Sequence, residues 1–125
     1  MRIVIADDDP AVLRQWLIIL QNDFDVIAAA RDGVMALDYI GRHQPEIAIL
    51  DMWMPSLDGL GITRRLKKAG SATAIILCSI ETDQQFIDAA RDAGALGYVF
   101  KFTMVRDLVL AVKSVAQGKP FISPL

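Results

Sequence analysis

Five polar residues stand directly after short apolar segments of the sequence: Asp7, Asp8, Asp51, Ser79 and Lys101. Each apolar segment has the length and composition of a buried β-strand. If these strands run parallel, their carboxyl ends meet at one edge of the sheet, where ligand sites of open α/β sheets lie. The spacing therefore predicts one site built from three carboxylates, a hydroxyl and an ammonium.

Three carboxylates at one place call for a cation, because two unit charges about 4 Å apart repel by about 4 kcal/mol at an effective dielectric constant of about 20. Oxygen-only ligands favour a hard cation, and we expect Mg²⁺ that retains some of its water. A metal ion, the Lys101 ammonium and the Ser79 hydroxyl around a carboxylate are the groups that stabilise a phosphoryl group in transfer. Asp51 is the natural nucleophile, because acyl phosphates are known covalent intermediates.

The elements that would position these groups alternate along the chain. Strands are expected at residues 3–6, 26–30, 47–50, 73–78 and 97–100, and a helical pattern follows each of them. This alternation predicts an α/β fold, a doubly wound parallel sheet of five strands with five helices on its two faces. Right-handed crossovers leave few strand orders, of which 2-1-3-4-5 is the common one. In that order the strands before Asp7, Asp51 and Ser79 are neighbours.

Capping residues mark the expected starts of three helices. Asp9 precedes Pro10 and suits the N-cap of the first helix, a cap that contributes about 1 kcal/mol. Thr82 and Gln85 have the spacing of a capping box for the fourth helix. Thr103 is the expected cap of the last helix.

Composition limits the class of protein. The 125 residues suit one domain, and 54% of them are hydrophobic, which is ample for a core. There is no apolar run long enough to cross a membrane, and the single cysteine allows no internal disulfide, so we expect a cytoplasmic protein with no membrane partner. The net charge of −2 gives no reason to expect nucleic acid to bind this segment. We expect the domain to span residues 1–117, followed by a linker or tail at 118–125.

Taken together, these motifs resemble the receiver domain of bacterial response regulators. The resemblance is carried by the pair Asp7–Asp8, the segment Asp51–Pro55 with Asp58–Gly59, the hydroxyl of Ser79, and the segment Gly97–Lys101. It covers essentially the whole chain and implies a flavodoxin-like (CheY-like) fold.

The resemblance also implies how the site works. A sensor histidine kinase would pass a phosphoryl group from its phosphohistidine to Asp51, and Ser79 and Lys101 would contact the phosphoryl oxygens. The resemblance implies four ligands for Mg²⁺: Asp7, Asp8, Asp51 and the backbone carbonyl of Trp53. Such a domain is a switch and not an enzyme with an outside substrate, since it catalyses only its own phosphorylation and dephosphorylation.

Further residues take roles in the switch by the same resemblance. Ser79, which stands where threonine is commoner, and Tyr98 would move toward the phosphoryl group. Trp53, Ile80 and Glu81 would border the path of the water that hydrolyses the aspartyl phosphate. Ile80 departs from the small residue that is usual at its position.

The last ten residues are similar to the start of the linker in LuxR-type transcription regulators. The resemblance implies homodimerisation on phosphorylation, and DNA binding only through a C-terminal helix-turn-helix domain absent from this chain.

Two alternatives remain at this point. Phosphatases of the haloacid-dehalogenase type also use a strand-end aspartate with Mg²⁺, but they place a second aspartate two residues later, where this chain has Trp53. A stand-alone receiver, or a pseudo-receiver that serves only as an interaction module, is the other. A pseudo-receiver would be expected to lack Asp51, Lys101 or one acid of the pair, and all are present.

Overall fold

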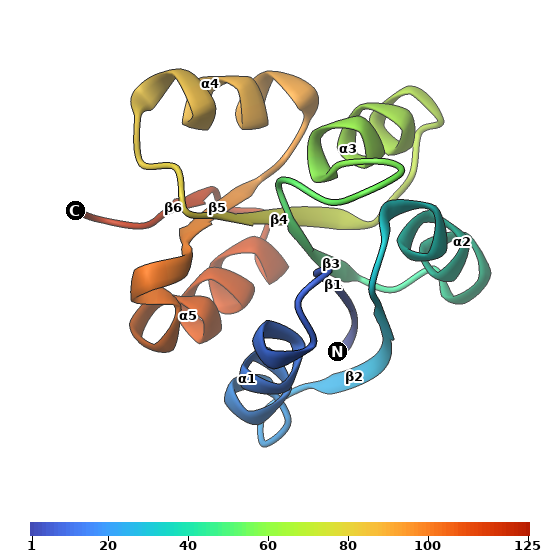
Figure 1. Ribbon diagram of the computed structural model, residues 1–125, viewed down its shortest axis with the longest axis horizontal. Coiled ribbons are helices and arrows are strands. Elements are labelled where there is room, and N and C mark those ends of the chain that lie inside the picture. The colour runs from blue at the N-terminus through green and yellow to red at the C-terminus, as the bar shows by residue number, and fades with distance from the viewer.

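A six-stranded parallel sheet forms the centre of the computed structural model, which describes residues 1–125 (Figure 1). Its order is β2-β1-β3-β4-β5-β6. The strands are β1 (Arg2–Ala6), β2 (Asp25–Ala30), β3 (Ile47–Asp51), β4 (Ala74–Ser79), β5 (Gly97–Phe100) and β6 (Phe121–Ile122). The order 2-1-3-4-5 of the first five strands is confirmed, whereas the count of five is wrong by one.

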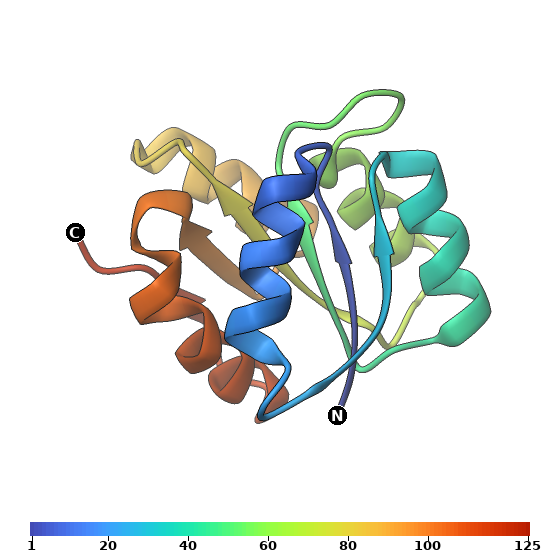
Figure 2. The same cartoon turned by 60° about the horizontal axis from the view of Figure 1, so that its bottom comes forward.

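Five α-helices cover the two faces of the sheet. They are α1 (Pro10–Leu20), α2 (Gly33–His43), α3 (Gly59–Lys68), α4 (Gln84–Ala93) and α5 (Met104–Ala116), and a 3₁₀ turn, η1 (Lys101–Thr103), joins β5 to α5. Helices α1 and α5 lie on one face, and α2, α3 and α4 lie on the other (Figures 1 and 2).

The continuous apolar runs follow from this layering, because each central strand is covered on both faces. Alternate residues of β1 and β3 enter different cores. Val4 and Leu50 belong to the cluster under α2, α3 and α4, whereas Ile5 and Ile49 belong to the cluster under α1 and α5. The central strands are therefore fixed from both sides, and their carboxyl ends are rigid supports for a site.

Part of the segment expected to be a linker or tail, residues 118–125, packs on the sheet. Phe121 and Ile122 form β6, which pairs in parallel with Gly97 and Tyr98 of β5. Gly118 reverses the chain after α5 with a φ of 75°, a left-handed conformation that glycine adopts without steric cost. A two-residue strand between Pro120 and a second proline has no periodicity to detect, which is why the sequence pattern favoured a linker.

Helix capping agrees only in part with expectation. Asp9 caps α1 by accepting a hydrogen bond of 2.9 Å from the Ala11 N–H. The expected Thr82 capping box is wrong, because Asp83 occupies the N-cap position of α4 and its side chain makes no capping bond. Thr103 is the N-cap residue of α5, but its hydroxyl donates to Asp107 at 2.7 Å and caps no backbone N–H.

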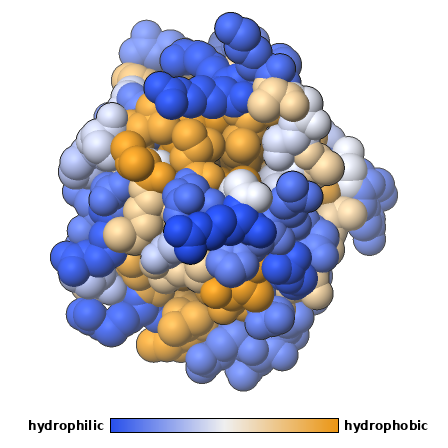
Figure 3. Space-filling view, turned by 90° about the vertical axis from the view of Figure 1, so that its right-hand side faces the viewer, coloured by the Kyte–Doolittle hydropathy of each residue, from blue (hydrophilic) through white to orange (hydrophobic).

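The side of the molecule that carries α2 and the edge strand β2 shows apolar surface between hydrophilic side chains (Figure 3). Helix α2 contributes two exposed apolar residues, Val34 and Met35. None of the helices combines the length and apolar character that crossing a bilayer requires.

Candidate functional site

The carboxyl ends of β1, β3 and β5 bring Asp7, Asp51 and Lys101 into contact. Ala6 pairs with Leu50 in the register of β1 and β3, so the next residues of the two strands, Asp7 and Asp51, stand side by side. The Lys101 Nζ atom lies 2.8 Å from Asp7 Oδ2 and 3.1 Å from Asp51 Oδ1. Both carboxylates are buried, and Lys101 is partly buried.

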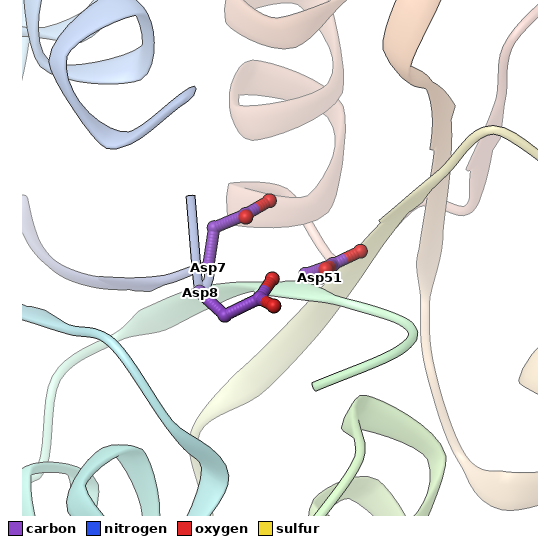
Figure 4. Close-up of side chains that lie close together, drawn as sticks. All are labelled: Asp7, Asp8 and Asp51. Atoms are coloured by element: carbon purple, nitrogen blue, oxygen red, sulfur yellow. The ribbon is translucent and has the colours of Figure 1, made fainter. Parts of the chain in front are cut away.

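The third carboxylate of the expected group joins them. Asp7, Asp8 and Asp51 each offer an oxygen within 4.8 Å of the others. Figure 4 shows the side chains of Asp7 and Asp8 directed toward the side on which Asp51 lies. Asp8 is exposed, so the group opens to solvent at this residue.

The electrostatics of the site reflect burial and repulsion. Burial raises the pKa of Asp51 to about 6, the nearby Asp7 carboxylate adds to the rise, and Lys101 acts against it. Burial also raises the pKa of Asp7, although contact with Lys101 offsets part of the effect. Burial alone would lower the pKa of Lys101, but its pairing with the two aspartates outweighs burial and the pKa is raised. One ammonium thus pairs with two buried carboxylates.

The donor set fits a hard divalent cation. Asp7 Oδ1 accepts a hydrogen bond of 2.8 Å from the Asp9 N–H. Asp7 Oδ2 is fully buried, and the Lys101 ammonium, 2.8 Å away, is its polar neighbour. A buried carboxylate oxygen that is paired only with an ammonium, in a group of three acids, is suited to an oxygen-ligand metal such as Mg²⁺.

The loop after β3 is held close to Asp51. The Met52 N–H donates to the carbonyl of Cys78 at 3.0 Å, and the Gly59 N–H donates to the carbonyl of Met52 at the same distance. A Cβ atom at Gly59 would stand 2.4 Å from the carbonyl oxygen of Asp51, so only glycine fits there. Trp53, whose backbone carbonyl is the fourth expected Mg²⁺ ligand, lies in this loop two residues beyond Asp51.

Ser79 and Tyr98 lie on β4 and β5, the strands on the far side of Asp51 from Asp7. Ser79 is fully buried, and its Oγ atom accepts a hydrogen bond of 3.0 Å from the Glu81 N–H. The Tyr98 hydroxyl donates to the carbonyl of Glu81 at 2.8 Å, and burial raises the pKa of Tyr98. Tyr98 is 2% exposed, so its side chain already points inward.

The three residues expected to border the water path lie on the loops after β3 and β4. Trp53 is 43% exposed and packs edge-to-face on Phe86 of α4, with ring centroids 6.3 Å apart. Ile80 is 70% exposed, and Glu81 is half-buried. Trp53 is therefore braced by a neighbour, whereas Ile80 projects into solvent.

The sequence analysis did not predict one cluster, in which the buried Asp107 carboxylate bonds to neighbouring side chains. The Asp107 side chain is 1% exposed and accepts hydrogen bonds from Arg106 Nε at 2.7 Å and from the Thr103 hydroxyl at 2.7 Å. Bonding to Arg106 lowers the pKa of Asp107 to about 2. Adjacent residues on a helix do not normally face each other, so the Arg106–Asp107 pair has no helical spacing that would have indicated it.

Comparisons with known proteins agree with this geometry. Residues 3–113 match the family described as the response regulator receiver domain. The oxygen regulatory protein NreC of Staphylococcus epidermidis is 35% identical over 125 residues, which are 98% of this chain and 57% of NreC. The chain thus spans little more than half of that relative.

Solved structures give the same result. The signal receiver domain of the response regulator NarL from Mycobacterium tuberculosis superposes with a TM-score of 0.90 and 29% identity, over 94% of this chain and 97% of that one. A LuxR-family two-component response regulator from Aurantimonas gives a TM-score of 0.93 and 28% identity, over 98% and 89% of the two chains. These matches confirm the resemblance inferred from the motifs: the chain belongs to the response regulator receiver domain family.

Proposed function

We propose that Asp51 accepts a phosphoryl group from the phosphohistidine of a sensor histidine kinase. One observation carries this proposal. Asp51 stands at the carboxyl end of β3 with the Lys101 ammonium 3.1 Å away and two further carboxylates grouped beside it. This arrangement places a nucleophile, a positive charge and a set of metal ligands around one point.

The transfer is an in-line displacement at phosphorus. An oxygen of the Asp51 carboxylate forms the new O–P bond while the P–N bond to the histidine breaks. The imidazole nitrogen keeps the electron pair of that bond and takes up a proton from water. With a pKa of about 6, Asp51 is mostly ionised at neutral pH, as a nucleophile must be.

Two side chains act on the phosphoryl oxygens. Lys101 exchanges part of its pairing with Asp7 and Asp51 for contact with the incoming group, whose negative charge it offsets. Ser79 donates its hydroxyl hydrogen, which the Oγ atom can do while it accepts from the Glu81 N–H.

Asp7, Asp8, Asp51 and the Trp53 backbone carbonyl would hold Mg²⁺. When bound, this cation offsets the charge of the carboxylates and of the phosphoryl oxygens. In the metal-free site, Lys101 is the cation that pairs with Asp7 and Asp51. Mg²⁺ should therefore be required for efficient uptake.

The domain is a switch and not an enzyme with an outside substrate. Trp53 occupies the position at which a haloacid-dehalogenase-type phosphatase carries its second aspartate, so the site lacks the acid–base residue that such a phosphatase uses. Similarity to the oxygen regulatory protein NreC and to a LuxR-family two-component response regulator supports a regulatory role, which we propose is control of transcription in the cytoplasm. The phosphorylated domain would form a homodimer, and DNA would be bound by a domain outside this chain.

The test is Mg²⁺-dependent labelling by a small phosphodonor such as acetyl phosphate, followed by intact mass. Wild type should gain one phosphoryl group, and Asp51→Asn should gain none. Asp23→Asn, which changes an exposed aspartate in the turn before β2, is the matched control and should label normally. Continuous release of phosphate without a labelled protein would support the phosphatase, and no labelling at all would support a pseudo-receiver.

A further inference from the structure

Helix α2 carries none of the residues assigned to the site, but its first residue, Gly33, contacts a loop that does. Residues 52–58, which we name the β3–α3 loop, include Trp53, whose carbonyl is a proposed Mg²⁺ ligand. In both ribbon views this loop reaches across to the start of α2 (Figures 1 and 2). There the Gly33 N–H donates to the carbonyl of Pro55 over 3.4 Å. A helix without a functional side chain is thus joined to part of the site.

The contact between Gly33 and this loop leaves no room for a side chain. A Cβ atom at Gly33 would overlap the carbonyl oxygen of Leu57 and would lie 2.8 Å from the Leu57 Cβ atom. The backbone of Gly33 does not itself require glycine, because its φ is not positive. Gly41, the other glycine of α2, has no atom within 4 Å of the place where a Cβ atom would stand. The requirement for glycine at the start of α2 therefore comes from the loop.

If a side chain forced the two backbones apart, the loop would move and the helix would stay. Behind Gly33, α2 is fixed by Ala36 and Ile40, which are buried in the core under α2, α3 and α4. The β3–α3 loop is exposed at Pro55 and Ser56. An exposed loop with few buried contacts deforms more easily than a helix packed on a sheet.

The base of the β3–α3 loop is closed, so a displacement stays inside it. The Gly59 N–H donates to the carbonyl of Met52 at 3.0 Å, and Met52 is fully buried. Only residues 53–58 are left to absorb a displacement of Leu57.

A tight turn limits how much these residues can absorb. The Leu57 N–H donates to the carbonyl of Pro55 at 2.8 Å, and Ser56 between them has a φ of 68°, in the left-handed region that residues other than glycine adopt at a cost. The proline ring fixes a further φ angle. Because the turn is constrained in this way, a displacement of Leu57 is passed on toward Trp53, two residues before Pro55.

We propose that Gly33 is a positioning residue for Mg²⁺, because it lets the β3–α3 loop settle against α2 and so sets the place of the Trp53 carbonyl. This inference rests on the proposed function, in which that carbonyl is a metal ligand. Mg²⁺ demands near-octahedral geometry with short bonds, whereas Ca²⁺ accepts longer and more varied ones. A displaced carbonyl should therefore weaken Mg²⁺ binding more than Ca²⁺ binding, a result that a simple loss of stability would not produce.

Titration of the metal-free protein with Mg²⁺, and separately with Ca²⁺, tests the role, with NMR amide shifts as the measure of binding. Gly33→Ala should weaken Mg²⁺ binding by about tenfold, as changes behind a metal ligand do, and should weaken Ca²⁺ binding clearly less. Gly41→Ala, in open space on the same helix, should leave both affinities unchanged. Gly97→Ala would place a Cβ atom 2.8 Å from Ile76 Cγ1 at the amino end of β5, away from the site, so it should lower stability without changing the ratio of the two affinities.

A measurement on wild type alone keeps the test independent of how well Gly33→Ala folds. An ion held by the Trp53 carbonyl should fix the loop, so the Gly33 amide, which bonds to Pro55, should exchange with solvent several-fold more slowly when Mg²⁺ is bound. The amide of Gln44, which bonds to Ile40 at the other end of α2, should not change. Equal exchange of the Gly33 amide with and without bound Mg²⁺ would overturn the role.

The positioning role and the proposed function fail in different ways, and labelling of wild type by acetyl phosphate is measured in parallel to separate them. If wild type is labelled and Gly33→Ala keeps the wild-type affinity for Mg²⁺, or loses Mg²⁺ and Ca²⁺ affinity equally, the positioning role is wrong and the phospho-acceptor function stands. If wild type takes up neither Mg²⁺ nor a phosphoryl group, both proposals are wrong.

Discussion

The Tyr98 hydroxyl donates to the backbone carbonyl of Glu81 over 2.8 Å, which joins β5 to the loop after β4. The same loop is fixed by Ser79, whose Oγ atom accepts from the Glu81 N–H. Glu81 is therefore bonded through both of its backbone polar groups, one to each of the two residues expected to move in the switch. Ser79 and Tyr98 are linked through the backbone of Glu81, so movement of either one acts on the other.

Tyr98→Phe should lower the free energy of unfolding by about 1 kcal/mol, because the carbonyl of Glu81 loses a partly buried hydrogen bond while ring packing is kept. Urea unfolding with a two-state fit measures the difference in the free energy of unfolding between the variant and wild type. Tyr39→Phe is the control, because the Tyr39 hydroxyl makes none of the hydrogen bonds in the structure and its loss should cost little. Equal losses in the two variants would mean that the bond to Glu81 does not stabilise the loop.

Asp8→Asn should raise the melting temperature by a few degrees in the presence of a chelator. Asp8 belongs to the group of three carboxylates, whose mutual repulsion disfavours the metal-free fold, and functional sites often retain such a cost. Asp23→Asn removes an exposed charge outside the group and should have little effect.

Mg²⁺ at millimolar concentration should stabilise wild type by linkage, and it should stabilise Asp8→Asn less because a ligand is missing. Thermal melts with and without the ion measure both effects. A wild-type melting temperature that does not respond to Mg²⁺ would count against a metal site.

The raised pKa of Asp51 predicts how stability depends on pH in a chelator. The carboxyl has a pKa of about 6 in the folded protein, against an ordinary value of 3.8. Between these values the folded state binds more protons than the unfolded state, so stability should rise as pH falls from about 7 to about 5. The raised pKa of Asp7 acts in the same direction.

Urea midpoints measured at several pH values above about 5 test this prediction. In that window Asp107 stays ionised, because its pKa is lowered to about 2 and its contribution is lost only in stronger acid. Asp51→Asn should flatten the profile. A wild-type stability that falls with pH across this window would contradict the assigned shift.

Sequence reasoning placed Asp7, Asp51 and Lys101 together because parallel strands deliver their carboxyl ends to one edge, and the apolar runs that identify buried strands are strong local signals. It missed β6, since Phe121 and Ile122 pair with Gly97 and Tyr98, which are far away in sequence. It also misplaced the cap of α4, where the box spacing was present but the helix begins at Gln84 without a side-chain cap. Local patterns identify elements, whereas contacts between distant residues decide their ends.

The lifetime of the aspartyl phosphate should depend on Ile80. Hydrolysis needs a water molecule in line with the scissile bond, opposite Asp51, and the side chains of Trp53, Ile80 and Glu81 are expected to border its approach. The Trp53 ring packs edge-to-face on Phe86, which holds the ring in place. Ile80 is 70% exposed and lies on the loop that leaves β4 directly after Ser79, so its truncation leaves no core cavity.

Ile80→Ala should therefore shorten the phosphoryl half-life several-fold with little change in stability, because admitting the attacking water lowers the barrier and each ~1.4 kcal/mol is a tenfold change in rate. The same substitution should speed uptake of the phosphoryl group from a small phosphodonor. The measurement is the decay of the labelled fraction by intact mass at equal Mg²⁺. Ile18→Ala is the matched control, since Ile18 of α1 is 67% exposed and equally branched. A half-life in Ile80→Ala that equals or exceeds that of wild type would show that Ile80 does not control access of water to Asp51.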